Sequence, residues 1–230
     1  MTTTPHSTVT PTTTMSTTPT STVRPAINRI CPHNNYMNDR IRANALMAHN
    51  YRRSRLAQGL VVNKRGRTLP PATNMLQLLY NCSLETSAVM SAMNCSATGS
   101  SRLPSGVEEN HYLVPKGEAK YRRDAIIEGV KKWWSQIRID GGIGQGVTYT
   151  QYNVGKPITW FTRMAWATTQ TFGCGVRSCG NNWSVVCHYM PGGNKLNQVI
   201  YKKGQPCSQC PKMTYCDSST KLCVPVSAAT

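Results

Sequence analysis

Residues 159–169 read Thr-Trp-Phe-Thr-Arg-Met-Ala-Trp-Ala-Thr-Thr, and Gly173-Cys174-Gly175 follows them in this 230-residue chain. Before this stretch, three segments place apolar side chains at helical spacing: residues 37–58, 74–93 and 118–139. Beyond it, three short segments are rich in β-branched and aromatic residues, which is typical of antiparallel strands: residues 171–176, 183–190 and 197–203. Helices followed by strands indicate an α+β fold with segregated layers.

The cysteines and the glycosylation sequons define the class of protein. Ten cysteines accompany Asn-x-Ser sequons at Asn81, Asn94 and Asn182, which together predict a secreted, extracellular, disulfide-bonded glycoprotein. No apolar run approaches the roughly 18 to 20 residues of a membrane-spanning helix, so we expect no transmembrane segment. All ten cysteines are predicted to form disulfides: Cys31, Cys82, Cys95, Cys174, Cys179, Cys187, Cys207, Cys210, Cys216 and Cys223.

Composition divides the chain into three parts. Residues 1–30 begin with an almost unbroken run of Thr, Ser and Pro, which predicts a disordered segment that is either an O-glycosylated spacer or an unmodified tail. Residues 31–203 carry the helix-like and strand-like segments of the main domain. Residues 204–230 hold four closely spaced cysteines, which could bind zinc, although the sequons favour disulfides.

Several motifs resemble those of the CAP superfamily, also called SCP/TAPS. Residues 159–169 resemble its Gly-His-Phe-Thr-Gln-x-Val-Trp signature, residues 186–194 its second signature, and Leu46-x-x-His49-Asn50-x-x-Arg53 its first-helix motif. With Glu108-Glu109-Asn110 and Trp133-Trp134-Ser135-Gln136, the resemblance covers about residues 31–203. The terminal cysteines make the chain most similar to the nematode activation-associated secreted proteins, or venom-allergen-like proteins.

This resemblance implies a three-layer α-β-α sandwich. Helices would cover both faces of a three-stranded antiparallel sheet, and a cysteine-rich hinge would follow at residues 204–230. The four hinge cysteines would pair among themselves, and the histidines of the motifs, His49 and His188, would have scaffold roles.

The resemblance also implies a central cavity in which two histidines and two glutamates can bind a divalent cation. In this sequence the four positions are Gly99, Glu109, Gln136 and Trp160. Zinc needs three or four N, S or O ligands, and of these residues only Glu109 is a typical one, so we expect no metal and no cofactor. His111, two residues after Glu109, is the one alternative ligand nearby in the sequence.

No catalytic residues are predicted, and we expect a protein that is not an enzyme. Nucleophilic catalysis needs a base beside the nucleophile, and the cavity positions that might supply a histidine are Gly99 and Trp160. Glu108 and Glu109 adjoin in the chain, and adjacent residues rarely face each other across a substrate.

Lipid binding is the function that the resemblance implies. Members of the superfamily bind sterols at an aromatic loop before the signature, which corresponds here to Val147, Tyr149, Tyr152 and Val154. Some members bind fatty acids between helices, where Ile126, Val130 and Trp133 either line a groove or form ordinary core. We therefore expect a secreted, non-enzymatic sterol- and lipid-binding protein of a parasitic nematode that acts at the host interface.

Charge supports an alternative function. The chain has 26 Lys+Arg against 9 Asp+Glu, a net charge of +17, and its basic clusters are spread along the fold: residues 52–55, 64–67, 122–123, 131–132 and 202–203. Such a charge attracts polyanions, and no segment resembles a nucleic-acid-binding motif. In this interpretation the protein is an immunomodulatory effector that binds a glycosaminoglycan, anionic lipid, matrix or a host surface protein.

Overall fold

The computed structural model describes residues 1–2 and 27–226. The predicted disordered segment therefore lies, for residues 3–26, outside the described residues. From Ile27 onward the chain is attached to the first helix, α1 (Asp39–Ala57), because the backbone N–H groups of Arg29 and Ile30 donate to the Asp39 carboxylate. The folded part thus begins a few residues before Cys31.

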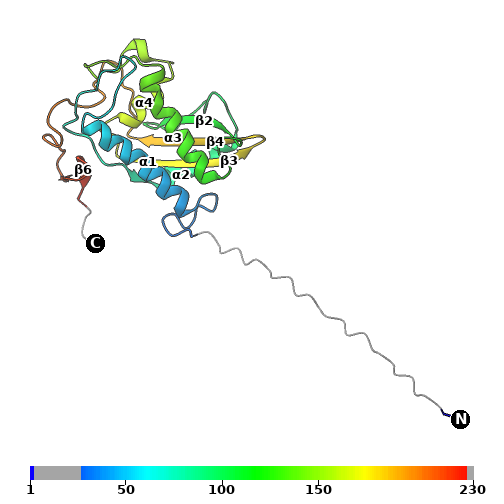
Figure 1. Cartoon of the computed structure of the whole chain (residues 1–230). Coiled ribbons are helices and arrows are strands. Elements are labelled where there is room, and N and C mark those ends of the chain that lie inside the picture. Colours follow the sequence, from blue (N-terminus) through cyan, green and yellow to red (C-terminus); the bar gives the residue numbers. More distant parts are fainter. Residues whose placement is uncertain (3–26, 227–230) are drawn as a thin grey trace.

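The centre of the fold is a four-stranded sheet in the order β1-β3-β4-β2 (Figure 1). Its strands are β1 (Leu79–Tyr80), β2 (Glu108–Pro115), β3 (Thr171–Cys179) and β4 (Asn182–Met190). The pairs β3–β4 and β2–β4 are antiparallel, whereas the two-residue β1 pairs parallel to β3. The α+β class predicted from the sequence is confirmed.

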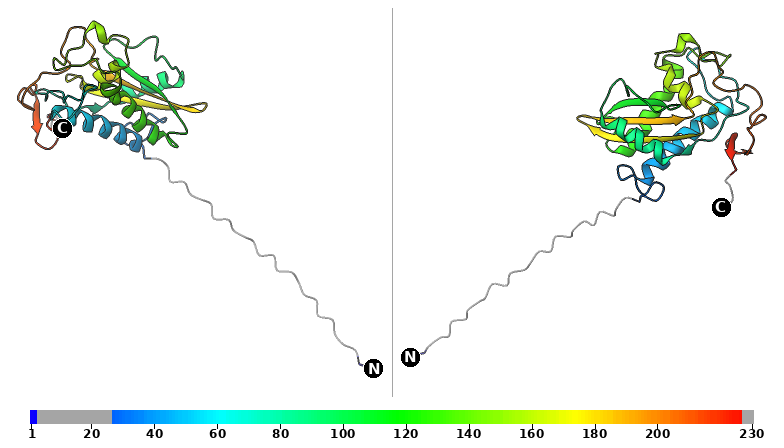
Figure 2. Two further views of the ribbon diagram at one scale, coloured as in Figure 1. Left: turned by 45° about the horizontal axis from the view of Figure 1, so that its top comes forward. Right: turned by 180° about the vertical axis from the view of Figure 1, so that it is seen from behind.

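Helices cover both faces of this sheet (Figure 1, Figure 2). On one face, α2 (Cys82–Met93) lies so close that a Cβ atom on Gly175 of β3 would approach the Val89 Cα to 2.6 Å. On the opposite face, Gly129 of α3 (Arg122–Ile139) rests against Val185 of β4. The last helix, α4 (Ile158–Ala165), follows a short 3-10 turn at Gln151–Asn153. Small residues at these contacts permit the close layering.

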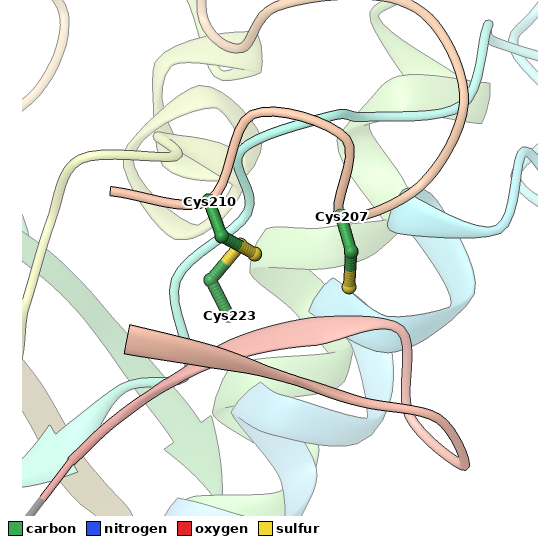
Figure 3. A group of neighbouring side chains, drawn as sticks. All are labelled: Cys207, Cys210 and Cys223. Carbon is green, nitrogen blue, oxygen red and sulfur yellow. A yellow bond between two sulfur atoms is a disulfide. The ribbon is translucent and has the colours of Figure 1, made fainter. Parts of the chain in front are cut away.

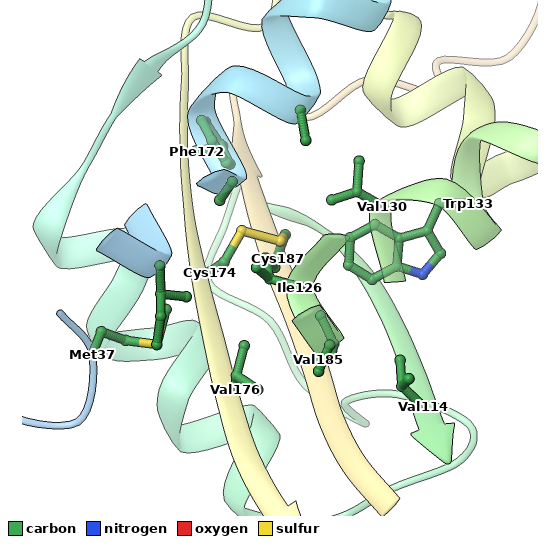
Figure 4. Packing of buried hydrophobic residues seen from close by; sticks show 14 of the residues in the cluster. Met37, Val114, Ile126, Val130, Trp133, Phe172, Cys174, Val176, Val185 and Cys187 are labelled. Atoms are coloured by element: carbon green, nitrogen blue, oxygen red, sulfur yellow. A yellow bond between two sulfur atoms is a disulfide. The ribbon is translucent and has the colours of Figure 1, made fainter. Parts of the chain in front are cut away.

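The main hydrophobic core lies between the sheet and the helices α1 and α3 (Figure 4). The Cys174–Cys187 disulfide crosses from β3 to β4 within this core, between residues that are paired in the sheet register. Two further disulfides hold the ends of α2. Cys31–Cys82 lies at its first residue, and Cys95–Cys179 lies just beyond its C-terminal end. A buried ion pair joins α1 to α2, because the Arg42 guanidinium donates to both Glu85 carboxylate oxygens at 2.7 Å.

The C-terminal segment packs against the rest of the fold through its last strand. Its hairpin, β5 (Thr214–Asp217) and β6 (Leu222–Pro225), is held by the disulfides Cys207–Cys216 and Cys210–Cys223. Leu222 is fully buried, and the Cys223 N–H donates to the Met75 carbonyl. All ten cysteines are thus paired, and the four terminal ones pair among themselves.

Two of the predicted elements are wrong in part. The helix predicted over residues 74–93 begins only at Cys82, because residues 76–79 are extended and their N–H groups bond to distant segments. Residues 197–203, predicted as a strand, do not form one. They make only isolated β-bridges, at Val199 and Lys203. The helices predicted at 37–58 and 118–139 and the strands at 171–176 and 183–190 are present as α1, α3, β3 and β4.

Candidate functional site

Three of the four cavity positions gather around His111. Gly99 has a φ of +86°, and a Cβ atom there would lie 2.5 Å from His111 Nδ1 and 2.8 Å from Glu109 Oε1. The His111 ring meets the Trp160 indole edge-to-face, with 6.0 Å between centroids. The imidazole of His111 therefore occupies the space into which a side chain at position 99 would project.

The fourth position, Gln136, is turned toward its own helix. It is buried, and its side-chain amide donates to the Lys132 carbonyl one turn earlier in α3 at 3.2 Å. A carboxylate at this position would be needed to complete the acidic half of the tetrad, and Gln136 offers a neutral amide instead.

Glu109 is already held by a dense set of donors. Its Oε1 accepts the Ser100 N–H at 2.8 Å, and its Oε2 accepts the Ser100 hydroxyl and lies 2.9 Å from His188 Nε2. Burial raises the pKa of this carboxyl, but the hydrogen bonds from His188 and Ser100 outweigh burial and hold the pKa at about 2. His111 Nδ1 lies 3.7 Å from Oε1, beyond hydrogen-bond distance.

The first-helix motif is structural. His49 is fully buried, with Nδ1 2.8 Å from the Ala45 carbonyl and Nε2 2.9 Å from the Tyr189 hydroxyl, and burial lowers its pKa to about 3. Arg53, also fully buried, donates to four backbone carbonyls, those of Leu76, Met164, Trp166 and Ala167. These side chains fix α1 against the segments that lead into and out of the sheet.

The predicted sterol-binding residues do not lie on one surface. Val147 and Tyr149 are buried in a second core cluster, whereas Tyr152 and Val154 are 64% and 46% exposed. Backbone hydrogen bonds pair residues 147–149 with residues 197–200, including Tyr149 N–H to Gln198 O at 2.9 Å and Ile200 N–H to Val147 O at 2.8 Å. The first half of the loop is therefore held by backbone hydrogen bonds. The side chains of the second half are exposed, and the Lys156 ammonium lies 3.0 Å from the centroid of the Tyr152 ring.

The predicted fatty-acid groove is core. Ile126, Val130 and Trp133 are each 0% exposed and pack against the sheet (Figure 4). The Trp133 indole N–H donates to the His111 carbonyl at 3.1 Å, which fixes the ring against β2. The reason is geometric, since the apolar stripe of α3 is covered by the strands and by α1.

The comparison with known families decides the identity. Residues 46–189 match the family model described as CAP, the cysteine-rich secretory protein family. The chain belongs to the CAP family.

Known proteins similar to this CAP protein include a secreted protein of Ancylostoma caninum. This chain is 35% identical over 206 residues to Ancylostoma secreted protein of Ancylostoma caninum, a match that covers 86% of this chain and 47% of that protein. The crystal structure of Na-ASP-1 is similar at 34% identity with a TM-score of 0.77, covering 86% of this chain and 50% of the other. The chain therefore spans about half the length of these two relatives.

One of the solved structures similar to this chain was determined with zinc. The crystal structure of NaASP2 with Zn²⁺ is similar at 30% identity and a TM-score of 0.75, over 83% of this chain and 98% of that one. In this chain Gly99 and Trp160 supply no typical metal ligand, and the Gln136 amide is bonded within its own helix. Both oxygens of the remaining Glu109 already accept hydrogen bonds.

A group of three cysteine sulfur atoms lies in the C-terminal segment of this CAP protein. Among the described residues, Cys207, Cys210 and Cys223 bring their sulfur atoms within 4.8 Å of one another (Figure 3). Cys210 is bonded to Cys223, and Cys207 to Cys216, so none of the three offers a thiolate. The zinc alternative for this segment is therefore rejected in favour of disulfides.

Ser87, His188 and Glu109 form a chain of contacts in the order hydroxyl, imidazole and carboxylate. Ser87 Oγ lies 2.7 Å from His188 Nδ1, and His188 Nε2 lies 2.9 Å from Glu109 Oε2. Acyl transfer also needs N–H donors for an oxyanion, and Ser87 lies inside α2, where helical bonding uses the backbone N–H groups. In this CAP protein these polar contacts connect α2 to strands β4 and β2 of the sheet.

The three sequon asparagines lie at element ends in the CAP domain. Asn94 is exposed at the C-cap of α2, Asn81 is the N-cap of the same helix, and Asn182 begins β4. The Asn81 side-chain oxygen accepts the Leu84 N–H at 2.9 Å. The amide nitrogen of Asn81, the atom that a glycan would modify, takes no part in this hydrogen bond.

Proposed function

We propose that this CAP protein is a secreted, non-enzymatic protein that binds sterols or related lipids and that a parasitic nematode uses at the host interface. The proposal is supported by an exposed apolar surface on the α3–α4 connection and the segment paired with it. We call this surface the loop face and define it by Tyr152, Val154, Leu196 and Val199, which are 46–64% exposed.

The loop face is built by the backbone pairing of the two segments. Asn197 N–H donates to the Tyr149 carbonyl at 2.8 Å, and Thr148 forms a bridge with Val199. The exposed apolar side chains thus stand on a support whose inner side chains, Val147 and Tyr149, are anchored in the core. Burial of such apolar area against a flat ring is favourable by about 25 cal/mol per Å².

The direct test is equilibrium binding of cholesterol to the double variant Tyr152→Ala/Val154→Ala. We expect its Kd to rise at least about tenfold, the equivalent of about 1.4 kcal/mol of lost apolar contact. Because both side chains are exposed in the free protein, its melting temperature should stay close to that of the parent.

A matched control removes an aromatic and a valine elsewhere. Tyr215 and Val226, 55% and 51% exposed, lie in the C-terminal segment, and their replacement by alanine should leave cholesterol binding unchanged. Equal affinity in the Tyr152/Val154 variant and the parent would eliminate the loop face as the lipid site.

Absence of catalysis belongs to the same proposal. It is supported by the residues at the four cavity positions and by the position of Ser87 within a helix.

None of the helices in the described part of the chain has the length and apolar character needed to cross a membrane.

The second candidate function is a matrix-binding or receptor-binding immunomodulatory effector that uses the CAP body as a scaffold. It is favoured by the net charge of +17 and by the location of the basic side chains described next.

A further inference from the structure

Two adjoining hollows run along the C-terminal ends of α1 and α3. One, of about 320 Å³, is lined by residues 60–62 and by side chains from residues 134–138. The other, of about 770 Å³, is lined by residues 63–65, Arg67, residues 140–145, Thr150 and Tyr152, so it borders the loop face at Tyr152, whereas the smaller hollow does not. The two hollows follow one another along both stretches of chain, which are joined by the Lys64 N–H to Ile137 O bond at 2.9 Å. We call them together the basic groove.

Seven cations line the basic groove. Arg52, Arg55, Lys131 and Arg138 lie around the smaller hollow, and Lys64, Arg65 and Arg67 around the larger one. Among its lining residues in the described chain, Asp140 is the single carboxylate, and its Oδ2 accepts the Ile158 N–H at 2.8 Å. Segments far apart in the sequence thus bring their positive charge to two neighbouring hollows.

Not every basic residue of the sequence clusters lies on the surface. Arg53 belongs to the same sequence cluster as Arg52 and Arg55, yet it is fully buried and bonded to backbone carbonyls. Arg55, Lys64, Arg65, Arg67, Lys131 and Arg138 are all exposed. The residues that line the groove therefore follow from the fold and not from the sequence clusters of basic residues.

We propose that the basic groove binds a sulfated polysaccharide of the heparin type. Five of its seven cations are arginines, whose planar guanidinium forks bind oxyanions in a bidentate manner. A small anion would engage one hollow, whereas a chain with sulfates at regular intervals can engage both and neutralise the whole row. The proposal rests on the extracellular location in the proposed function, where such polymers occur, and not on lipid binding.

The test compares two charge-reversed proteins with the same net charge. Arg55→Glu/Arg138→Glu changes two exposed cations of the groove, and Lys202→Glu/Lys203→Glu changes two exposed cations outside it. Each is measured for affinity to a defined heparin oligosaccharide at 0.15 M salt, for elution from a heparin column and for elution from a sulfonate cation exchanger.

We expect the groove variant to lose at least about tenfold in heparin affinity and the control variant less than threefold, while both elute at similar salt from the cation exchanger. The parent should also show a steep fall of affinity with salt, because several ionic contacts are exchanged for counterions. Cholesterol binding of the groove variant should equal that of the parent, which separates this proposal from lipid binding.

Three results would overturn the proposal. The first is equal loss of heparin affinity in the two variants, which indicates attraction by net charge alone. The second is competition by single-stranded DNA of the same charge as effectively as by heparin. The third is elution of the parent from heparin at no higher salt than from the cation exchanger.

Discussion

Replacement of Arg53 by methionine is expected to lower the free energy of unfolding by about 3–5 kcal/mol. The guanidinium is 0% exposed and donates to carbonyl oxygens of Leu76, Met164, Trp166 and Ala167 at 2.7–3.2 Å. Methionine fills most of the volume but leaves these carbonyls without donors, and each unsatisfied buried acceptor costs about 1–3 kcal/mol. Chemical denaturation with the disulfides intact measures the loss.

The neighbouring Arg55→Met variant is the control for this prediction. Arg55 is exposed on the same helix, and its replacement should change the free energy of unfolding by less than about 0.5 kcal/mol. Similar effects of the two substitutions would show that the carbonyl contacts of Arg53 contribute little, and that the first-helix motif does not fix α1.

The second large effect is a loss of stability in acid that depends on Glu109. The folded protein holds the pKa of this carboxyl at about 2, below its ordinary value of 4.5. The resulting stabilisation is therefore complete above pH 4.5 and is lost as the pH falls through about 2, because the unfolded chain takes up the proton first. A difference of this size corresponds to about 3 kcal/mol.

Unfolding of Glu109→Gln measured between pH 7 and pH 2 checks this prediction. The variant should be less stable than the parent at pH 7 and should approach it at pH 2, since the parent then loses the contribution of its carboxylate. Glu118→Gln, at an exposed position, should follow the parent throughout. A constant difference between Glu109→Gln and the parent at every pH would contradict the assigned hydrogen bonds from Ser100 and His188.

Much of the fold could be predicted because local pattern and final structure agree in α1, α3, β3 and β4. They disagree at residues 75–79, where Met75, Leu76 and Leu78 have helical spacing but are buried in an extended segment. The backbone of this segment bonds to Ala167, Gln170 and Cys223, about 90 to 150 residues further along the chain. No local signal contains such partners, and tertiary contacts overrode the helical pattern.

The candidate site could be located from motifs, but its geometry could not be predicted. The resemblance identified Gly99, Glu109 and Trp160, and the structure brings all three to His111. What the sequence missed is that His111 fills the space beside Gly99, because the strand pleat places Glu109 and His111 on the same face. An i, i+2 spacing in a strand was the available signal, but β2 was not predicted as a strand.

The sterol loop shows the same difference between sequence and structure. Val147, Tyr149, Tyr152 and Val154 are all apolar or aromatic, and sequence alone treats them as equivalent. Pairing with residues 197–200 buries the first two and leaves the last two exposed. The same pairing adds Leu196 and Val199 to the exposed surface, and no motif in the sequence indicated them.

We propose that this CAP protein binds lipid on its surface without a metal in its cavity. Titration of the purified chain with radiolabelled cholesterol, in the presence and absence of EDTA and with unlabelled cholesterol and palmitate as competitors, tests it most directly. We expect saturable binding that cholesterol displaces and that EDTA does not alter. Absence of saturable binding, or its loss in EDTA, would contradict it.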